Sequence, residues 1–342
     1  MRAVAIFEHG GVDQLRLTEL PDPEPAADEV LIRVHAVALN RLDLWVRQGL
    51  PGVKLQMPFV LGSDVAGTIA ATGSAVAGYE PGRRVTINPG WWDGTCEYCL
   101  RGEQSLCVNF KLFGEHLPGG YAEYIRVPAR NVLPIPDDFT FEQVAAAPLA
   151  FLTAWRALIT RGRLKAGETI VVLGAGSGVS TAAIQIARLA GARVIATSHS
   201  DDKLERARAL GAELVFNYSR QEWEREVWLA TGKRGADIVV DSIGEATWLK
   251  SIRALRKGGR LVTYGATSGP NPREEIRQIF WKQLDVLGST MSNQREFLQV
   301  MDLVFRRKLV PVVDQVLPLE EAREAHRRLA SNEQFGKIVL RV

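Results

Sequence analysis

All three cysteines of the 342-residue chain lie in one short segment, GWWDGTCEYCLRGEQSLC, which ends at Cys107. They are spaced C-x2-C-x7-C, and Asp93 stands three residues before Cys96, where one more cysteine would extend the series. Carboxylate oxygen binds zinc at about 2.0–2.2 Å and thiolate sulfur at about 2.3 Å, so Asp93 can complete a tetrahedral shell with Cys96, Cys99 and Cys107. Three cysteines form no disulfide framework, and their clustering predicts a metal site in a reducing, cytoplasmic setting. The alternative is a group of buried cysteines without metal.

A second chemical signal is the glycine-rich stretch VVLGAGSGVS. Gly174, Gly176 and Gly178 follow an apolar run and precede a helical pattern, so their backbone amides can approach a pyrophosphate at a helix N-terminus. The match to G-x-G-x-x-G is incomplete, because Val179 takes the place of the third glycine and Ser180 stands where the helix packs on the strand. A turn that needs glycine only for its backbone is the alternative, but the strand–turn–helix–strand context favours a dinucleotide site.

The choice of dinucleotide depends on the end of the next apolar strand, in ATSHSDDK. An Asp or Glu there would hold the ribose hydroxyls of NAD and repel a 2′-phosphate, but the sequence has Ser198, 24 residues after Gly174. Ser198 and His199 can donate hydrogen bonds and Lys203 can pair with a phosphate, although Lys203 also fits a solvated helix beside two aspartates. The sequence therefore favours NADP, with NAD as the alternative.

Composition limits the broader function. A chain of this length with 46% hydrophobic residues predicts two domains, each with its own core. The net charge of +3 is spread along the chain without a long basic run, so nothing in the sequence calls for nucleic acid or a charged membrane as a partner. The first residues predict a strand and not a signal peptide, and no apolar stretch is expected to reach the roughly 20 residues of a membrane span. A small-molecule substrate is the remaining expectation.

The elements that position these residues change character near Thr140. Residues 1 to 130 alternate apolar and polar in short runs, which predicts a small, irregular β-structure. Residues 140–159 predict a helix capped by Thr140 and kinked at Pro148, and strands alternating with helices follow, which predicts an α/β unit with a doubly wound parallel sheet. A last helix lies within 292–309, and GKIVLRV predicts a strand that returns to the first domain.

The ordered set of motifs PFVLGSDVAGTIAATG, the cysteine loop, GGYAEYIRVP, AAAPLAFLTAWRAL, the glycine-rich turn, GGRLVTYGATSG and FGKIVL resembles the medium-chain dehydrogenase/reductase superfamily, which contains zinc-dependent alcohol dehydrogenases and zinc-free quinone reductases. The resemblance covers the whole chain. It implies an α/β protein with a GroES-like β-rich catalytic domain, residues 1–150 completed by 289–342, and a Rossmann domain, residues 151–288. It also implies an active site in the cleft between the domains and a homodimer or homotetramer.

The resemblance separates the two branches of the superfamily. In the zinc alcohol dehydrogenases the catalytic metal is held by Cys, His-Glu and Cys, and this chain has Asn40, Ser63 with Asp64, and Leu149 at those positions. The proton-relay positions are Leu42 and Trp45. The usual Lewis acid and proton exit are therefore not expected here.

The segment NRLD resembles the N-x-x-D of the quinone-reductase branch and makes Asn40, Asp43 and Asp64 the candidate catalytic residues. Arg41 matches a position that faces the cofactor pyrophosphate, with a surface arginine as the alternative. The cysteine loop matches the structural-zinc lobe of the superfamily, which implies one closed, non-catalytic zinc on Asp93, Cys96, Cys99 and Cys107. Expected cofactor contacts are Arg41, Gly174, Gly176, Ser177, Gly178, Val179, Ser198, His199, Lys203, Tyr218, Gly265, Ala266 and Thr267.

The leading hypothesis is an NADPH-dependent oxidoreductase that transfers hydride to a small carbonyl compound, enone or quinone. Asn40 would bond the acceptor oxygen, and water or His116 would supply the proton, although a lone histidine is more often an ordinary loop residue. Aromatic side chains that could wall the pocket are Trp45, Trp91, Trp92 and Phe151. One alternative is a zinc-type alcohol dehydrogenase with unusual ligands drawn from Asp43, Asp64 and His116. The other is a non-enzymatic NADPH-binding redox sensor.

Overall fold

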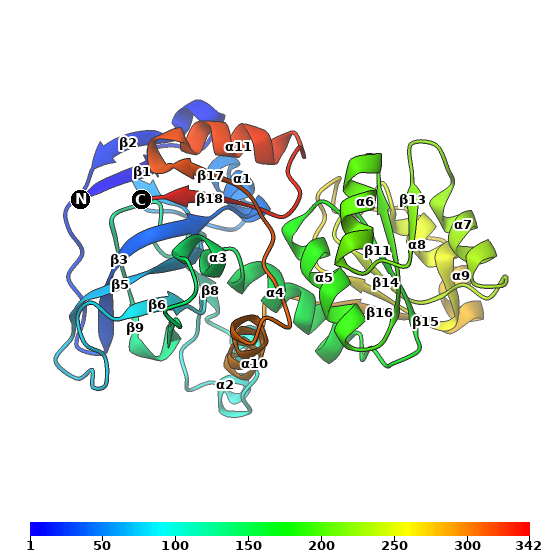
Figure 1. Cartoon of the computed structure of the whole chain (residues 1–342), viewed down its shortest axis with the longest axis horizontal. Helices are drawn as coiled ribbons and strands as arrows, with labels where there is room; N and C mark the ends of the chain where they lie inside the picture. Colours follow the sequence, from blue (N-terminus) through cyan, green and yellow to red (C-terminus); the bar gives the residue numbers. More distant parts are fainter. The chain divides into compact units, whose positions relative to one another are not determined.

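The computed structural model describes residues 1–342 and divides into two compact units (Figure 1). Unit 1 contains Met1–Ala150 and Ser292–Val342, and unit 2 contains Phe151–Met291. The chain returns to unit 1 at residue 292, three residues after the position expected from the sequence.

Unit 1 is built on a seven-stranded sheet in the order β10-β6-β5-β3-β18-β17, with β9 paired to β3. The C-terminal strand β18 pairs antiparallel with β3, Val339 opposite Ala38, so the last residues of the chain complete the sheet, as GKIVLRV predicts. A three-stranded sheet, β2-β1-β4, and the small pair β7-β8 lie beside it in the same unit. The strands are β1 Arg2–Ile6, β2 Arg16–Glu19, β3 Glu29–Ala38, β4 Phe59–Val60, β5 Asp64–Thr72, β6 Arg84–Ile87, β7 Gly90–Trp91, β8 Lys111–Leu112, β9 Tyr124–Pro128, β10 Val132–Pro134, β17 Val313–Pro318 and β18 Lys337–Arg341.

The helices of unit 1 show how local sequence places their ends. Thr140 caps α3, because its hydroxyl accepts a hydrogen bond from the Gln143 backbone and Gln143 returns one to Thr140. At Pro148, where the sequence predicts a kink, the helical run is interrupted: α3 (Phe141–Ala145) ends before the proline and α4 (Pro148–Trp155) begins at it, because proline fits the first turn of a helix and not its interior. Helix α4 passes from unit 1 into unit 2 after Ala150, and the remaining helices of unit 1 are α1 Arg41–Gln48, α2 Glu97–Leu100, α10 Gln294–Phe305 and α11 Ala322–Ala330.

The helical run from Phe141 to Arg161, which ends in a π-helical turn over Arg156–Arg161, is long and apolar enough by length and composition alone to cross a membrane. This corrects the expectation that no stretch of the chain approaches that length. In the fold, 72% of the most apolar window is buried inside the protein, which is the ordinary behaviour of a core helix.

Unit 2 has a six-stranded parallel sheet in the order β13-β12-β11-β14-β15-β16. The chain starts in the middle of the sheet, builds outward to one edge and then crosses to build the other, which is the Rossmann order and confirms the predicted α/β fold. The strands are β11 Thr169–Val172, β12 Arg193–Ser198, β13 Leu214–Asn217, β14 Ala236–Asp241, β15 Leu255–Thr263 and β16 Asp285–Gly288.

Helices cover this sheet on its two faces (Figure 1). One face carries α5 (Gly178–Leu189) and α6 (Asp201–Leu210), and the other carries α7 (Trp223–Ala230), α8 (Trp248–Ala254) and α9 (Ile276–Lys282). Apolar side chains such as Trp223 and Ile252 pack there against buried strand residues such as Val239. Because helices cover both faces of the sheet, the central residues of β11 (170–172) and of β14 (238–240) are all apolar.

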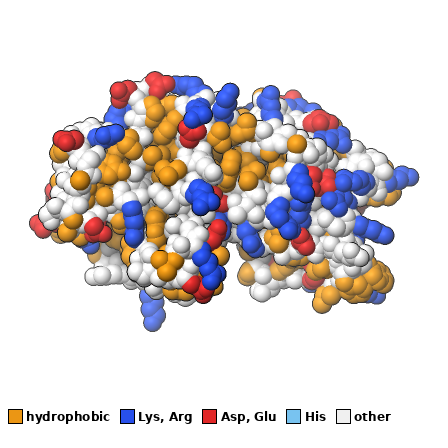
Figure 2. All heavy atoms as spheres, turned by 90° about the horizontal axis from the view of Figure 1, so that it is seen from below, with side chains coloured by type: hydrophobic (Ala, Val, Ile, Leu, Met, Phe, Trp, Pro, Cys, Tyr) orange, Lys and Arg blue, Asp and Glu red, His pale blue; other side chains and the backbone are white.

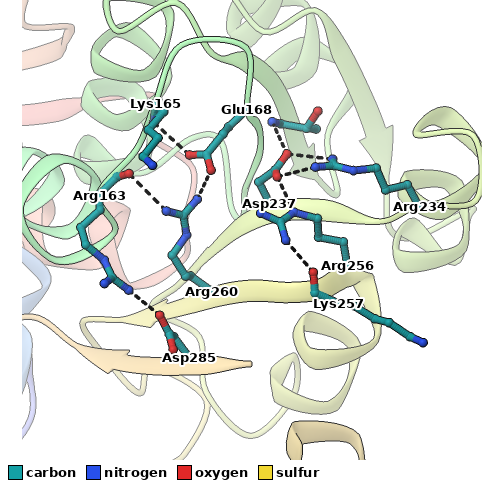
Figure 3. Close-up of polar contacts among 10 residues, drawn as sticks. Arg163, Lys165, Glu168, Arg234, Asp237, Arg256, Lys257, Arg260 and Asp285 are labelled. Carbon is teal, nitrogen blue, oxygen red and sulfur yellow. Dashed lines mark hydrogen bonds and ion pairs between the residues drawn. The ribbon is translucent and has the colours of Figure 1, made fainter. Parts of the chain in front are cut away.

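An ionic cluster lies at the amino ends of β11, β14 and β15 (Figure 3). Asp237 is 2% exposed and accepts hydrogen bonds from Arg234 at 2.7 and 3.0 Å, from Arg256 and from the Thr169 backbone at 2.8 Å. These donors hold the pKa of Asp237 well below its usual range, although burial alone would raise it. The cluster fixes the start of neighbouring strands, opposite the edge where a dinucleotide would bind.

The surface carries both signs of charge. On the face drawn in Figure 2, Lys and Arg side chains lie interspersed with Asp and Glu, and apolar side chains lie between them. This mixture agrees with the even spread of charge along the sequence.

Candidate functional site

The cysteine loop folds into a compact group of potential metal ligands in unit 1. One oxygen of Asp93 and the sulfur atoms of Cys96, Cys99 and Cys107 all lie within 4.8 Å of one another. Cys99 and Cys107 are buried against Trp92, and the guanidinium of Arg130 lies 4.9 Å from the centre of the Trp92 ring. Three thiolates and a carboxylate at these separations match a closed four-coordinate zinc shell.

Hydrogen bonds orient the ligands of this group. Asp93 accepts from the backbone of Thr95 at 2.8 Å and of Cys96 at 3.0 Å and from the side chain of Asn109 at 2.9 Å, and these donors hold its pKa well below the usual range. Burial instead raises the pKa of Cys99 to about 12. A buried thiol of this kind becomes a thiolate when a cation binds it, so the donor set fits zinc.

Two of the candidate catalytic residues, Asn40 and Asp64, contact Lys337, which was not among the residues expected from the sequence. Asn40 Nδ2 donates to Asp64 Oδ2 at 2.9 Å, and Lys337 Nζ lies 2.9 Å from the same oxygen. Lys337 also donates a hydrogen bond to Asn40 Oδ1. The other oxygen of Asp64 accepts from the Leu149 backbone at 2.7 Å. Asn40, Asp64 and Lys337 thus form a buried cluster, which we call the Asn40 cluster.

Asp43 lies beside this cluster and leads into a buried polar chain. Its Oδ2 accepts from the Asn40 backbone at 2.8 Å, which begins helix α1, and from the Tyr121 hydroxyl at 3.0 Å. Tyr121 in turn lies 3.2 Å from His326 Nε2, and Arg47 lies 3.1 Å from His326 Nδ1. Burial raises the pKa of Asp43 to about 6, while the Asn40 backbone, the Lys337 charge and Tyr121 oppose that rise.

His116 has a different setting from the one that a proton donor needs. Its Nδ1 accepts a hydrogen bond from the Leu112 backbone at 3.3 Å, and burial lowers its pKa. The neighbouring Glu115 is more buried, with a side chain 15% exposed, and burial followed by the charge of Asp43 raises its pKa to about 7. Burial therefore favours the neutral form of both side chains, the imidazole of His116 and the carboxyl group of Glu115.

The unusual metal shell weighed above, with Asp43, Asp64 and His116, is not assembled. Asp64 is paired with Lys337, Asp43 is bonded by Tyr121, and Nδ1 of His116 accepts from the Leu112 backbone. The structure gathers one group of three or more metal-ligating side chains, which is the cysteine loop. The donor set of the Asn40 cluster does not fit zinc.

The glycine-rich turn connects β11 to α5 in unit 2. Gly174 has a φ of 63°, a left-handed conformation that favours glycine. Ser177 caps α5 by accepting from the Ser180 backbone at 3.0 Å, and Ser180 Oγ donates to the Leu173 carbonyl at 2.8 Å. The hydroxyl of Ser180 therefore ties the helix to the strand where the strict motif would have a third glycine, and Gly178 and Val179 form the first turn of the helix.

The end of β12 places the residues expected to select the dinucleotide. Ser198 is 2% exposed, whereas His199 is exposed, and its Nδ1 lies 3.2 Å from the Tyr218 hydroxyl. Lys203 is 8% exposed and interacts within the protein. A cavity of about 220 Å³ opens at this edge, and its lining includes Leu173, Thr197, Tyr218 and Ile243. The exposed pair His199 and Tyr218 thus stands beside a pocket at the carboxyl edge of the sheet.

A second loop at this edge contains Gly265, Ala266 and Thr267. Thr267 bonds the Ser242 carbonyl through its backbone at 3.1 Å and its hydroxyl at 3.0 Å, so the loops after β14 and β15 are joined. Asp241, at the end of β14, organises the partner loop by accepting from the backbones of Ile243 and Gly244. The carboxyl edge of a doubly wound sheet is where such folds bind dinucleotides.

The remaining expected residues are divided between the units. Arg41 belongs to unit 1, where its guanidinium donates to the Leu329 carbonyl at 3.1 Å and to Asn332. Trp91 lines a cavity of about 530 Å³ within unit 1, Trp92 packs on the cysteine loop, and Trp45 is half-buried. Phe151 is buried in unit 2.

Sequence reasoning missed five functional candidates, namely Lys337, Tyr121, His326, Asp241 and Glu115. Lys337 and Tyr121 stand in the motifs FGKIVL and GGYAEY, whose charged and hydroxyl members could have been examined as partners for Asp64 and Asp43. The sequence offered one indication for His326: it stands four residues after Ala322 and three before Leu329, which places it on the apolar face of helix α11.

Two family profiles match the chain. The one described as "Alcohol dehydrogenase GroES-like domain" matches residues 26–137, and the one described as "Zinc-binding dehydrogenase" matches residues 178–306. Together they cover most of both units.

Individual relatives align over nearly the full length. A protein named "NAD-dependent alcohol dehydrogenase" from Sulfurisphaera tokodaii is 34% identical over 99% of both chains, and one named "Quinone oxidoreductase" from Homo sapiens is 31% identical over 99% of this chain and 97% of its own. A crystal structure named as an NAD-dependent alcohol dehydrogenase shares 47% identity and a TM-score of 0.97, with complete coverage of both chains. The alcohol dehydrogenase of Aeropyrum pernix has 28% identity and a TM-score of 0.93.

Proposed function

Because this chain belongs to the medium-chain dehydrogenase/reductase superfamily, in the family of zinc-containing alcohol dehydrogenases and quinone oxidoreductases, we propose that it reduces a small carbonyl compound, enone or quinone with NADPH. Its relatives support an NAD(P)-dependent oxidoreductase, and the zinc-binding dehydrogenase profile together with the group of Asp93 and three cysteines supports a zinc site. The choice of substrate, the preference for NADPH and the role of the zinc are the proposed parts.

The Asn40 cluster carries the proposal on the substrate. A zinc alcohol dehydrogenase polarises its substrate with a Lewis acid, whereas this cluster is an amide, a carboxylate and an ammonium already bonded to one another. Such a cluster can donate hydrogen bonds to an acceptor oxygen that gains negative charge. Hydrogen bonds polarise the acceptor oxygen less strongly than a metal ion does, and activated acceptors such as enones and quinones suit this weaker polarisation. Quinone oxidoreductases are among the relatives.

Each unit has a separate task in this function. The glycine-rich turn, with the capped N-terminus of α5, would hold the pyrophosphate, and the edge formed by His199 and Tyr218 would hold the adenosine ribose. The reduced nicotinamide supplies the hydride. Unit 1 contributes donors for the substrate oxygen from the Asn40 cluster, while Glu115 and solvent can supply protons.

The zinc is proposed to be structural. Asp93, Cys96, Cys99 and Cys107 use all four positions of a tetrahedral shell, so no position remains for a substrate. Its contribution would be to hold the loop between β7 and β8 in one conformation. We also propose a cytoplasmic homodimer or homotetramer.

The preference for NADPH rests on Ser198, which stands where an acid would repel the 2′-phosphate. His199 and Tyr218 are exposed beside it and can donate hydrogen bonds to a phosphate. Several relatives are named NAD-dependent, so a preference for NADPH would distinguish this chain from them.

Two measurements test the proposed function. Cofactor oxidation should be screened with aldehydes, enones, quinones and, in reverse, alcohols, using NADPH and NADH in parallel. Turnover of enones or quinones above that of simple alcohols supports the proposal, and no turnover with any of them favours the non-enzymatic sensor. Fluorescence titration should give a lower Kd for NADPH than for NADH, and Ser198→Asp should reverse the order. Equal Kd values for wild-type protein would remove the cofactor preference.

A further inference from the structure

Lys337 is the first residue of β18, and its ammonium group is buried in unit 1. The side chain is 5% exposed, and its Nζ contacts Asp64 Oδ2 at 2.9 Å and Asn40 Oδ1. Asp64 is completely buried. A buried ammonium is retained only where it is paired, so the carboxylate and the amide account for its presence.

The hydrogen bonds of Asn40 leave it poorly placed to polarise a substrate. Its Oδ1 accepts from Lys337, one Nδ2 proton goes to Asp64 at 2.9 Å, and Nδ2 also lies 3.5 Å from the Ala38 carbonyl. These partners fix the orientation of the amide, with its oxygen toward the cation. Asn40 is therefore a positioning residue for Lys337.

Lys337 has a donor to spare. An ammonium group has three N–H bonds, and two of those on Lys337 are directed at Asp64 and Asn40. The third has no acceptor in the protein. A hydrogen bond from a charged donor to a developing oxyanion is roughly twice as strong as one from a neutral amide.

We propose that Lys337 is the catalytic residue that bonds the acceptor oxygen of the substrate and protonates it, in the role that a Lewis acid has in a metal-dependent dehydrogenase. The inference rests on the proposed reductase function and adds the residue that performs its polarisation step. Asn40 and Asp64 hold the ammonium in place.

A bound reduced nicotinamide would supply a hydride, that is, two electrons and the hydrogen of a new C–H bond at the electrophilic carbon of the substrate. The π pair moves to the substrate oxygen, directly in a ketone or aldehyde and through the conjugated bonds in an enone, and that oxygen takes a proton from Lys337 Nζ. Water then returns a proton to the amine, so carbonyl, NADPH and one proton become alcohol or enol and NADP⁺.

The central test compares Lys337→Met with Lys337→Arg, using exposed Lys308→Met as the matched control. Lys337→Met should lower kcat by about 10²–10³-fold, the usual effect of removing one oxyanion donor, with a Kd for NADPH close to that of wild type. Ammonium ion added to Lys337→Met should restore part of the rate, because methionine vacates only the position of Nζ and NH4⁺ returns an N–H donor to it. Lys337→Arg should retain more activity than Lys337→Met, and Lys308→Met should match wild type.

A second variant covers the case in which Lys337→Met does not fold, since it leaves Asp64 as a buried unpaired charge. Asp64→Asn/Lys337→Met removes both charges and should fold, bind NADPH and remain slow. Wild-type kcat in either folded variant overturns the inference. A higher Kd for NADPH with unchanged kcat at saturation also overturns it, because Lys337 would then anchor the cofactor. Failure of wild-type protein to reduce any acceptor is a different result, which rejects the proposed function itself.

Discussion

The hydroxyl of Tyr121 lies 3.2 Å from Nε2 of His326, and both side chains are completely buried. Tyr121 donates its own proton to Asp43 at 3.0 Å, so the proton between Tyr121 and His326 must belong to Nε2. The opposite nitrogen, Nδ1, then accepts from Arg47 at 3.1 Å. His326 is therefore a neutral imidazole with its proton on Nε2, and the chain from Arg47 to Asp43 has a single direction of donation.

This assignment predicts a pH-dependent stability that His326→Gln should reduce. Burial and the Arg47 charge lower the pKa of His326 from 6.5 to about 3. The unfolded chain takes up a proton at this histidine below pH 6.5 and the folded chain does not. The contribution of neutral His326 to the free energy of unfolding is thus fully present above pH 6.5. It declines toward pH 3, with a slope of up to about 1.4 kcal/mol per pH unit.

Urea unfolding of wild type and His326→Gln between pH 4 and 7 measures this slope. Glutamine can still accept from Arg47 and donate to Tyr121, so the variant keeps the chain but not the titration. The free energy of unfolding of the variant should fall less steeply with acid than that of wild type, and the exposed His9→Gln should behave as wild type. Parallel curves for wild type and His326→Gln would contradict the assignment.

Removal of the zinc should act on stability and not on chemistry. Metal analysis should return about one zinc per chain for wild type and none for Cys99→Ser, because the remaining ligands no longer close the shell. Structural zinc in small modules contributes on the order of 10 kcal/mol of apparent binding, so Cys99→Ser should melt at a clearly lower temperature. The kcat per folded molecule should stay near that of wild type.

A second zinc, or loss of activity on brief chelation while the protein stays folded, would instead indicate a catalytic zinc, as in the alcohol dehydrogenases. Circular dichroism during chelation separates these outcomes.

In the ionic cluster of unit 2, an Asp→Asn substitution should have a large effect on the free energy of unfolding at Asp237 and a small one at Asp285 (Figure 3). Asp237 is 2% exposed and bonded by two arginines, and Asp237→Asn should lower the free energy of unfolding by about 2–4 kcal/mol at pH 7. Asp285→Asn is the matched control, because Asp285 and Arg163 are both at least half exposed and should lose less than about 1 kcal/mol.

The pH dependence of the Asp237 effect has a defined sign. The pKa of Asp237 is lowered from 3.8, so its contribution is present above pH 3.8 and is lost as the pH falls toward the lower folded value. The difference between wild type and Asp237→Asn should therefore shrink below pH 4. A constant difference from pH 7 to pH 3 would show that the arginine pairs are not its cause.

The fold and the metal loop could be predicted from sequence because both depend on local pattern. The Rossmann order follows from apolar strands alternating with helices, and the four metal ligands lie within fifteen consecutive residues. Asn40 and Asp64 of the Asn40 cluster could be predicted from the sequence, but Lys337 could not. Lys337 is almost 300 residues from Asn40 and reaches it through the pairing of β18 with β3. The sequence located the irregularity at Pro148 but not its form, because a proline in an apolar helical pattern can begin a new helix as readily as bend an old one.

Glu115 should lower the free energy of unfolding of the protein at alkaline pH. Its side chain is 15% exposed, and burial together with the charge of Asp43 raises its pKa from 4.5 to about 7. A group whose folded pKa is raised contributes fully below its unfolded value and loses that contribution as the pH rises through 7. At pH 8.5 wild-type protein must hold Glu115 as a buried anion near Asp43, which costs on the order of 1–3 kcal/mol. Glu115→Gln has no charge to bury.

Chemical unfolding at pH 4.5 and at pH 8.5 tests this expectation. Glu115→Gln should match wild type within experimental error at pH 4.5 and exceed its free energy of unfolding at pH 8.5, while the exposed Glu80→Gln should show no such gain. The same variant also reports on proton supply, because loss of the alkaline limb of the kcat profile would identify Glu115 as the acid that loses its proton near pH 7. If Glu115→Gln is less stable than wild type by the same amount at both pH values, the carboxyl group acts through hydrogen bonding and its raised pKa has no part in stability.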